Sequence, residues 1–477
     1  MSIRVILCTI FVLFFTFYAW RNLFASVCAS ILLMAVMQHP DVRDALKNIG
    51  GVQGLNPWNI MMLSILLAWN TWRRREGLEW DMPRNIRNLL VVYCLVVVWS
   101  AFRLLLNVSE IPAEYGFTFG SVISEDIINC LKWILPCVIL FDICRTRRQL
   151  VVGLLVVLGL YLALALQVIK HIPPSYALSD DFQHLSYKLV QNETGYNRVT
   201  LSMMLGGASW ALLAMLGLAE KTAHRWVIFS VAGMIAYGQA LTGGRSGYVS
   251  WGAVGLILCV VRWRKLLPVI PTVIVAICVF FPQIRDRMMH GIGVGDQATD
   301  TYEMTSGRNI AWPYVIAQIK EGPILGFGRE AMITTGVYQK ILDDTQDTES
   351  FPHPHNAYLQ LLLDDGLLGF SLIIPFYWVV LRCSFRLFRD HSDHLFEAAG
   401  GVCCALVLAL MVAGMGGETF YPREGAVGMW AAIGIMLRVH VERNRSIETG
   451  RPLFGEEEGN ADGTELVERM EGVETAV

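Results

Sequence analysis

Long apolar blocks recur along almost the whole chain. Each is roughly the length that a helix needs to cross the hydrocarbon core of a bilayer, about 20 residues. Because lipid offers no partner to backbone N–H and C=O groups, such blocks must be helical. We therefore predict an all-α polytopic membrane protein with about 12–13 transmembrane helices. The predicted spans are 4–20, 23–38, 56–72, 89–106, 127–144, 149–168, 199–219, 226–242, 247–263, 266–282, 357–381, 396–415 and 425–439.

Basic residues gather in alternate connectors between the predicted spans. Counting spans puts all of these connectors on one side of the membrane, and the positive-inside rule makes that side cytoplasmic. The residues concerned are Arg73, Arg74, Arg75, Arg84, Arg87, Arg145, Arg147, Arg148, Lys221, Arg225, Arg262, Arg264, Lys265, Arg382, Arg386, Arg389, Arg438, Arg443 and Arg445.

The remaining connectors are predicted to lie on the outer side of the membrane, and one of them is large. It covers residues 283–356 and carries six Lys/Arg against ten Asp/Glu. A connector of this length is too long for a simple turn. We expect short helices in it, one from Arg308 to Lys320 that ends at Glu321-Gly322-Pro323. The other outer loops are 107–126, 169–198, 243–246 and 416–424. The predicted domains are 1–282 (N-terminal spans), 283–356 (periplasmic loop), 357–440 (C-terminal spans) and 441–477 (disordered acidic cytoplasmic tail).

Composition and motifs exclude several classes of function. Only 17% of residues are charged and the net charge is −3, so there is no electrostatic footprint for nucleic acid. The eleven cysteines lie in or beside apolar blocks without metal-ligand spacing. We find no Asp-x-Asp, His-Glu-x-x-His, Gly-x-Ser-x-Gly or P-loop motif. No metal and no cofactor are therefore predicted.

A histidine-containing loop precedes the predicted span at 357. His355 has a side chain whose ordinary pKa, about 6.5, suits a general base. Asn356 is the residue type that caps a helix N-terminus. Gly366 comes eleven residues after His355, about three helical turns, so the two are expected on one helix face. Gly366 and Gly369 would let another backbone approach that face. The alternative is that His355 is only a cap or surface residue.

Three arginines begin elements on the predicted outer side. Arg245 lies in the glycine-rich turn 241–247, whose backbone N–H groups and guanidinium favour an anion. Arg308 opens the predicted loop helix, and a helix N-terminus with an arginine is a good phosphate site. Arg198 begins another span. Each has a plainer interpretation, as an interfacial anchor or a surface ion pair.

Other polar residues near the spans are weaker candidates. An ionisable residue inside a span is a functional hypothesis by default, which applies to Lys132 and Asp142, although a lysine can extend its amine to the interface. The outer loop 416–424 could close over a site, through Glu418, Tyr421, Arg423 and Glu424.

Three segments together resemble the O-antigen ligase and O-antigen polymerase family of bacterial inner-membrane glycosyltransferases. The first is Leu-Thr-Gly-Gly-Arg-Ser-Gly at 241–247. The second is Ser-Gly-Arg at 306–308, followed by Trp312 and by 323–328. The third is His-Asn at 355–356, then nine residues, then Gly-Leu-Leu-Gly at 366–369, which matches the family's ligase signature without a gap. The resemblance covers about 195 to 440. The start of the chain looks like the exosortase-associated O-glycosylation ligase subset.

The resemblance implies a substrate class and a set of residue roles. The donor would be a glycan on undecaprenyl diphosphate, and the acceptor a hydroxyl of a glycan, lipid or protein. By analogy His355 would be the base, and Arg308, Arg245 and Arg198 would hold the diphosphate. Asn356 would orient His355. The enzyme would be multi-pass in the inner membrane, with its active site facing the periplasm. It would be metal-independent and would invert the anomeric carbon.

Two other functions stay open at this stage. A polymerase would use the same donor but join it to another lipid-linked repeat unit, and the sequence does not distinguish the acceptor. A membrane transporter would show polar groups near the bilayer midplane, whereas the candidates here gather at one face.

Overall fold

Most of the predicted spans are helices in the computed structural model. The structure describes residues 2–46, 56–173, 182–268, 307–348, 350–417 and 419–450 and a few isolated positions from 270 to 305. Most of the predicted span 266–282, the start of the large loop and residues 451–477 lie outside this description. The long helices are α1 (Ile3–Tyr18), α2 (Leu23–Met37), α4 (Pro57–Glu76), α5 (Arg84–Asn107), α7 (Cys130–Ile143), α8 (Arg147–His171), α11 (Arg198–Leu213), α12 (Thr222–Leu241), α13 (Arg245–Val261), α20 (Ala357–Arg389), α21 (His394–Ala413) and α22 (Val427–Thr449).

Shorter elements occupy the connectors. The predicted helix of the large loop is confirmed as α17 (Arg308–Glu321), and two further short helices follow it. No strand occurs in the described part of the chain, so the all-α prediction is confirmed. The short elements are α3 (Pro40–Leu46), α6 (Phe119–Val122), a π-helix (Ile123–Asn129), α10 (Phe182–Thr194), α18 (Ala331–Thr334) and α19 (Val337–Thr345), together with several 3₁₀ turns.

Within the described ranges, five helical segments are long and apolar enough to cross a membrane. A sixth is possible if α2 and α3, which meet at 109°, form one broken span. Helices α1 and α13 are apolar but shorter. The chain is therefore a polytopic helical membrane protein, and the count of twelve or thirteen spans stays a prediction. The five segments are Arg84–Glu110, Arg147–His171, Arg198–Leu218, Ala357–Arg389 and His394–Ala413.

Helix α21 is at the centre of the bundle. It contacts α11, α13, α20 and α22, and it is the most buried of the candidate spans. Small residues allow these approaches: a Cβ added at Gly207 on α11 would lie 2.8 Å from the Ala409 Cβ on α21. Close contact of this kind is how helices associate where lipid removes most of the hydrophobic driving force.

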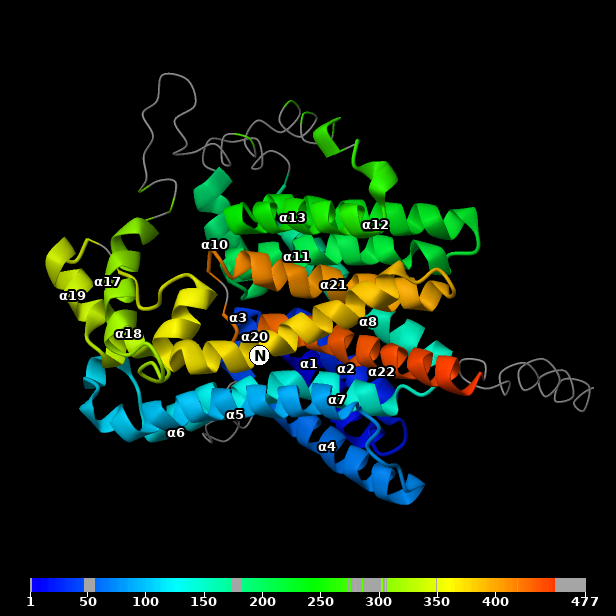
Figure 1. Cartoon of the computed structure of the whole chain (residues 1–477), viewed down its shortest axis with the longest axis horizontal. Helices are drawn as coiled ribbons and strands as arrows, with labels where there is room; N and C mark the ends of the chain where they lie inside the picture. Colours follow the sequence, from blue (N-terminus) through cyan, green and yellow to red (C-terminus); the bar gives the residue numbers. More distant parts are fainter. Residues whose placement is uncertain are drawn as a thin grey trace, which may run out of the picture.

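The basic connectors meet at one end of the bundle. Arg438 and Arg145 both bind Asp81, at 2.7 and 3.0 Å. Arg147 pairs with Asp393 at 2.5 Å, and further pairs join Arg262 to Glu397 and Arg443 to Asp390. In Figure 1 the C-terminal ends of α4 and α22 lie at this end, on the right, while α17, α18 and α19 lie at the opposite end. The expectation that the basic connectors share one side is thus confirmed.

Asp142, one of the charges expected inside the membrane, belongs to this ion-paired end. It accepts hydrogen bonds from Arg73, Arg145 and the Trp69 indole, at 2.7, 3.0 and 2.8 Å. Because its carboxylate is fully partnered, it has a structural role in joining α4 to α7.

Candidate functional site

Helix α20 is broken at Gly366. That residue has φ 64° and ψ −167°, a conformation that is essentially restricted to glycine. The segment Pro323–Gly328 lies against the break. Leu367 N–H donates to the Pro323 carbonyl at 2.8 Å and Leu368 N–H to that of Ile324 at 3.0 Å. The expectation of one unbroken helix from the histidine loop through Gly366 is therefore wrong.

Gly366 was also predicted to let another backbone come close, and the segment Pro323–Gly328 does so. The same segment also donates back, from Phe327 N–H to the Leu363 carbonyl at 2.9 Å and from Gly328 N–H to that of Asp364 at 2.6 Å. Four backbone hydrogen bonds thus replace those that the break removes from the helix. At Gly369 a Cβ would lie 2.2 Å from the Asp365 Cβ of the same helix and 3.4 Å from Val96 of α5, so side chains, and not a second backbone, lie closest to this glycine.

His355 lies just before α20 and is held from two sides. Asn356 is the N-cap as predicted, its Oδ1 accepting from Tyr358 N–H at 3.0 Å and Leu359 N–H at 3.1 Å. On the other side, the Trp312 indole N–H of α17 donates to the Pro354 carbonyl at 3.0 Å. His355 itself has φ 50°, an uncommon conformation for a residue with a Cβ that persists where the surroundings impose it.

Two imidazoles lie together in this loop. The ring centroids of His353 and His355 are 4.1 Å apart. Burial and, after it, the charge of Arg308 lower the pKa of His355 to about 4. Burial, His355 and nearby arginines lower the pKa of His353 to about 3. Both rings are therefore neutral near pH 7, so each has a ring nitrogen that can accept a proton.

The pH dependence of transfer should report this lowered pKa. Because the neutral base is lost only as the pH falls through the pKa of His355, about 4, kcat/KM for the donor is expected to stay level from pH 8 to about 5. It should fall below that. The measurement is a pH profile of kcat/KM, with the melting temperature recorded at each pH as a control for unfolding. A fall centred near the ordinary histidine pKa of about 6.5 would contradict the assigned environment.

Arg308 and the turn that carries Arg245 meet at the loop after α21. A Cβ built on Gly416 would lie 3.3 Å from the Ser246 Cβ and 3.8 Å from Arg308 Nη1. The pKa of the Arg308 guanidinium is lowered by burial and by the charge of Arg245. Ser246 Oγ is buried and has no hydrogen-bond partner among the described residues. Two cations and a hydroxyl thus lie close together, a combination of donors that suits an anion.

Arg198 begins α11 beside the same turn. A Cβ at Gly244 would lie 3.3 Å from the Arg198 carbonyl oxygen, so the N-termini of α11 and α13 are in contact. The Arg198 guanidinium lies over the Tyr187 ring, 5.2 Å from its centroid. The N-cap residues of α13 and α17 are glycines without a capping side chain, although Thr305 Oγ1 accepts from Asn309 N–H in the first turn of α17 at 3.3 Å. Each N-terminus carries the partial positive charge of a helix dipole. The structure thus brings the three candidate arginines to one end of the bundle.

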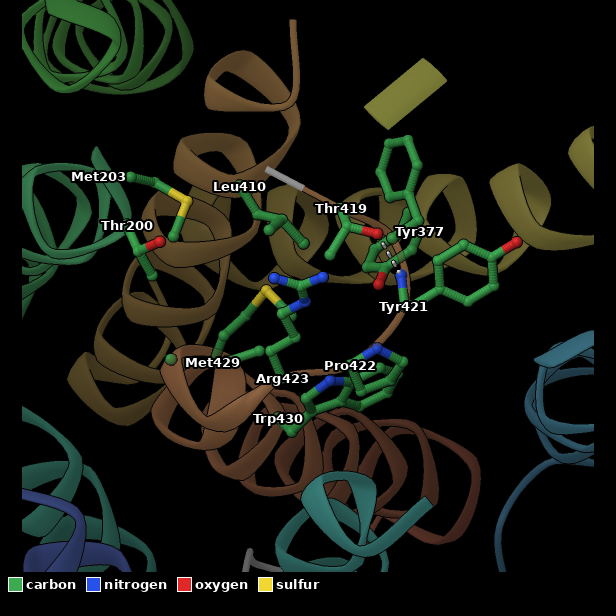
Figure 2. Close-up of a pocket in the computed structure, with 13 residues that line it drawn as sticks. Thr200, Met203, Tyr377, Leu410, Thr419, Tyr421, Pro422, Arg423, Met429 and Trp430 are labelled. Atoms are coloured by element: carbon green, nitrogen blue, oxygen red, sulfur yellow. Dashed lines mark hydrogen bonds between the residues drawn. The ribbon is translucent and has the colours of Figure 1, made fainter. Parts of the chain in front are cut away.

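The loop 419–424 passes between this region and the helices beneath it. Figure 2 shows the Arg423 side chain extending among Leu410, Thr419 and Met429, where these residues line a small cavity of about 20 Å³. Tyr421 is buried and donates from its hydroxyl to Asp365 Oδ2 at 2.6 Å. Tyr421 therefore anchors the loop to α20. A loop held in this way does not suit the expectation that it could close over a site. Glu418 lies outside the described residues.

A buried polar cluster beneath this loop was not anticipated. Arg329 donates to Asp126 Oδ1 at 3.0 Å and lies over the Tyr421 ring, 3.8 Å from its centroid. Asp364 accepts from Ala331 N–H at 3.2 Å. The signal was present in the sequence, because Asp364 and Asp365 are adjacent carboxylates in a predicted span. Among the described residues, no group of three or more His, Cys, Asp and Glu side chains is placed to hold a metal ion.

Comparison with known proteins agrees with the motif resemblance. Residues 227–374 match a family model described as O-antigen ligase. The matched range contains Arg245, Arg308 and His355. This similarity makes the chain O-antigen ligase-like in the segment that supplies most of the candidate site.

Two curated relatives carry names that point the same way. A protein of Rickettsia bellii named "Putative polysaccharide ligase" is 22% identical over 207 residues, which are 42% of this chain and 48% of that protein. A Rickettsia conorii protein of the same description is 22% identical over 184 residues, 38% and 44% of the two chains. The chain thus spans about half the length of the curated relatives it matches.

Proposed function

We propose that this protein is an inner-membrane glycosyltransferase that moves a glycan from undecaprenyl diphosphate to an acceptor hydroxyl at the periplasmic face. The observation that carries the proposal is the succession of Arg198, Arg245 and Arg308, each the first residue of its helix and each near the next, with Arg308 near a neutral His355. The match of residues 227–374 to O-antigen ligases supports it.

The cationic helix ends suit the leaving group of this reaction. When the bond from the anomeric carbon to the diphosphate breaks, negative charge builds up on the departing oxygen. Arg245 and Arg308 are already close enough for the charge of one to lower the pKa of the other. Fixed positive groups at the position where charge develops stabilise the transition state without reorganisation. The Ser246 hydroxyl would add a neutral donor.

His355 is assigned the acceptor side of the reaction. As the acceptor oxygen bonds to the anomeric carbon, its proton passes to the neutral imidazole of His355, and the diphosphate leaves from the opposite face of the sugar. A single displacement of this kind inverts the anomeric carbon. Asn356 supports His355 by capping α20, and Trp312 fixes the loop from the α17 side.

The arginines give the direct test of the donor site. With purified protein and a defined undecaprenyl-diphosphate glycan, Arg308→Ala and Arg245→Ala are each expected to reduce kcat/KM on the order of 10²-fold, the usual effect of losing one charge-stabilising group. Arg382→Ala, at an exposed position of α20 toward its opposite end, is the matched control. Full activity in both site variants, with normal protein levels, would remove the basis of the proposal.

Product analysis distinguishes the two acceptor classes. If the protein is a ligase, cells that lack it accumulate long glycan chains on the lipid carrier, and the purified enzyme labels a separate acceptor molecule. If it is a polymerase, single repeat units accumulate instead. The ligase outcome is expected, because both the matched family and the curated relatives are described as ligases.

A further inference from the structure

A second and larger cavity lies on the other side of the loop 419–424. Its volume is about 530 Å³, within the range of about 300–1,000 Å³ that is usual for small-molecule sites. Segments far apart in sequence form its wall: the α2–α3 corner, the start of α4, the π-helix with α7, Arg329-Glu330 and the loop 422–424. The roles assigned to His355 and the three arginines leave this space without a function.

The charges that line this cavity nearly balance. Its cations are Arg43, Lys132 and Arg329, and its carboxylates are Glu125, Asp126, Glu330 and Glu424. Arg423 also lines it, although its guanidinium extends into the smaller cavity. Positive and negative groups therefore nearly balance, without an excess of positive charge. The donor site, by contrast, presents arginines, helix N-termini and a hydroxyl. A phosphate or diphosphate would gain nothing from the balanced cavity, whereas a neutral molecule rich in hydroxyls finds both acceptors and donors of hydrogen bonds there.

The local backbone turns several of these groups to one side. Residues Ile123–Asn129 form a π-helix, a rare element that often marks a functional position. Within it, Glu125, Asp126 and Asn129 all line the cavity. Asn129 Nδ2 donates to Glu125 Oε2 at 2.5 Å. The Glu125 side chain is exposed, so its carboxylate is available to a ligand.

Two residues of the cavity are held in place by buried contacts. Lys132 donates to Asn59 Oδ1 at 3.0 Å and lies over the Trp133 ring, 4.4 Å from its centroid. Arg329 is 4% exposed, and its Nη1 has no hydrogen-bond partner among the described residues; it is 3.9 Å from Asp364 Oδ2. Charged groups that are desolvated and fixed in advance are typical of a binding site rather than of a solvated surface.

The cavity reaches toward the histidine pair. Arg329 and Arg423 line it, and their charges are among the causes that lower the pKa of His353, after burial and His355. Its wall is built from α2, α4 and α7, whereas the donor site is built from α11, α13 and α17. The two sites are thus built from different helices, and each has an arginine near the histidine pair.

We infer that this cavity binds the saccharide that accepts the transferred glycan, as a neutral, hydroxyl-rich sugar. The inference rests on the proposed function, since it assigns the second substrate of the same reaction. Glu125 of the π-helix and Glu424 of the loop 419–424 both line the cavity and accept hydrogen bonds from the hydroxyls of the sugar. One hydroxyl of the bound sugar then points out of the cavity toward His355.

Kinetics of two substrates test the assignment. Glu125→Gln and Glu424→Gln keep the size of each side chain and remove its charge. Each is expected to raise the KM for the acceptor at least fivefold and to leave the KM for the undecaprenyl-diphosphate glycan unchanged. The acceptor is the membrane fraction extracted from a strain that lacks this enzyme, titrated at saturating donor. Glu114→Gln, an exposed residue outside the cavity, is the control and should change neither value.

A binding measurement keeps the inference separate from the proposed function. The protein in lipid nanodiscs is applied to an array of neutral, phosphorylated and uronic-acid oligosaccharides, with no donor present. Neutral oligosaccharides should bind the wild type and lose most of their signal with Glu125→Gln. If they do so while no transfer is ever observed, the enzyme proposal fails and the sugar site stands. An unchanged acceptor KM in both variants, or binding of charged glycans alone, would overturn the sugar site and leave the enzyme proposal intact.

Discussion

Replacing His355 by alanine is expected to reduce kcat for glycan transfer about 10³-fold, within the range typical of a lost general base. The KM for the donor should change little, because the diphosphate is assigned to the arginines. The physical reason is that burial keeps the imidazole neutral, so it is ready to take the acceptor's proton at pH 7. The measurement is steady-state transfer by purified protein from a defined lipid-diphosphate glycan.

The control for this variant is a histidine far from the loop. His391 is exposed in the connector between α20 and α21, and its replacement by alanine should leave both constants unchanged. His355→Gln, which keeps hydrogen bonding but not basicity, separates proton transfer from orientation. If it restores most of the wild-type rate, His355 orients the acceptor and another group removes the proton.

Replacing Gly366 by alanine is expected to destabilise the folded protein by more than about 3 kcal/mol, because two penalties combine. Its backbone conformation is one that other residues adopt only at a cost of about 1–3 kcal/mol. A Cβ there would also overlap the Ile324 carbonyl oxygen, which forces the segment 323–328 away from α20 and breaks its hydrogen bonds. The effect is measured by thermal unfolding in detergent, in which the remaining fraction of monodisperse protein is recorded at each temperature.

Gly77 provides the matched control for this substitution. It also has a positive φ, 61°, but a Cβ there would meet nothing within 4 Å. Gly77→Ala should therefore cost only the backbone strain, about 1–2 kcal/mol. Equal losses in the two variants would mean that strain alone explains the glycine at 366 and that the close approach of the segment 323–328 contributes little.

The positions of the helices could be predicted from the sequence, whereas a break within one of them could not. Hydropathy and length located almost every long helix, since a membrane span needs a continuous apolar block. The start of α17 at Arg308 and the capping by Asn356 were also predicted, because capping chemistry is local. The break at Gly366 was not. A glycine in an apolar run is compatible with a continuous helix, and only the distant segment 323–328 makes the broken form the better one.

The candidate site likewise contains residues that could be predicted from the sequence and residues that could not. Arg245, Arg308 and His355 stand out in the sequence because each lies in a short motif at the start of a helix. Arg329 and Asp126 do not, although their side chains are buried together. Their importance comes from partners about 200 positions away in the chain, and no local pattern carries that information.

The break in α20 also determines which side chains meet the surrounding lipid. The segment 323–328 packs against α20 at this break. Four apolar side chains there are exposed, with exposed fractions of 66% for Ile324, 54% for Leu325, 58% for Leu367 and 46% for Leu368. In a bilayer these four side chains would enter the acyl region beneath the headgroups. They would then set the depth at which the proposed donor site lies in the membrane. At that depth a carrier's isoprenoid chain could stay among the acyl chains while its diphosphate reaches the arginines.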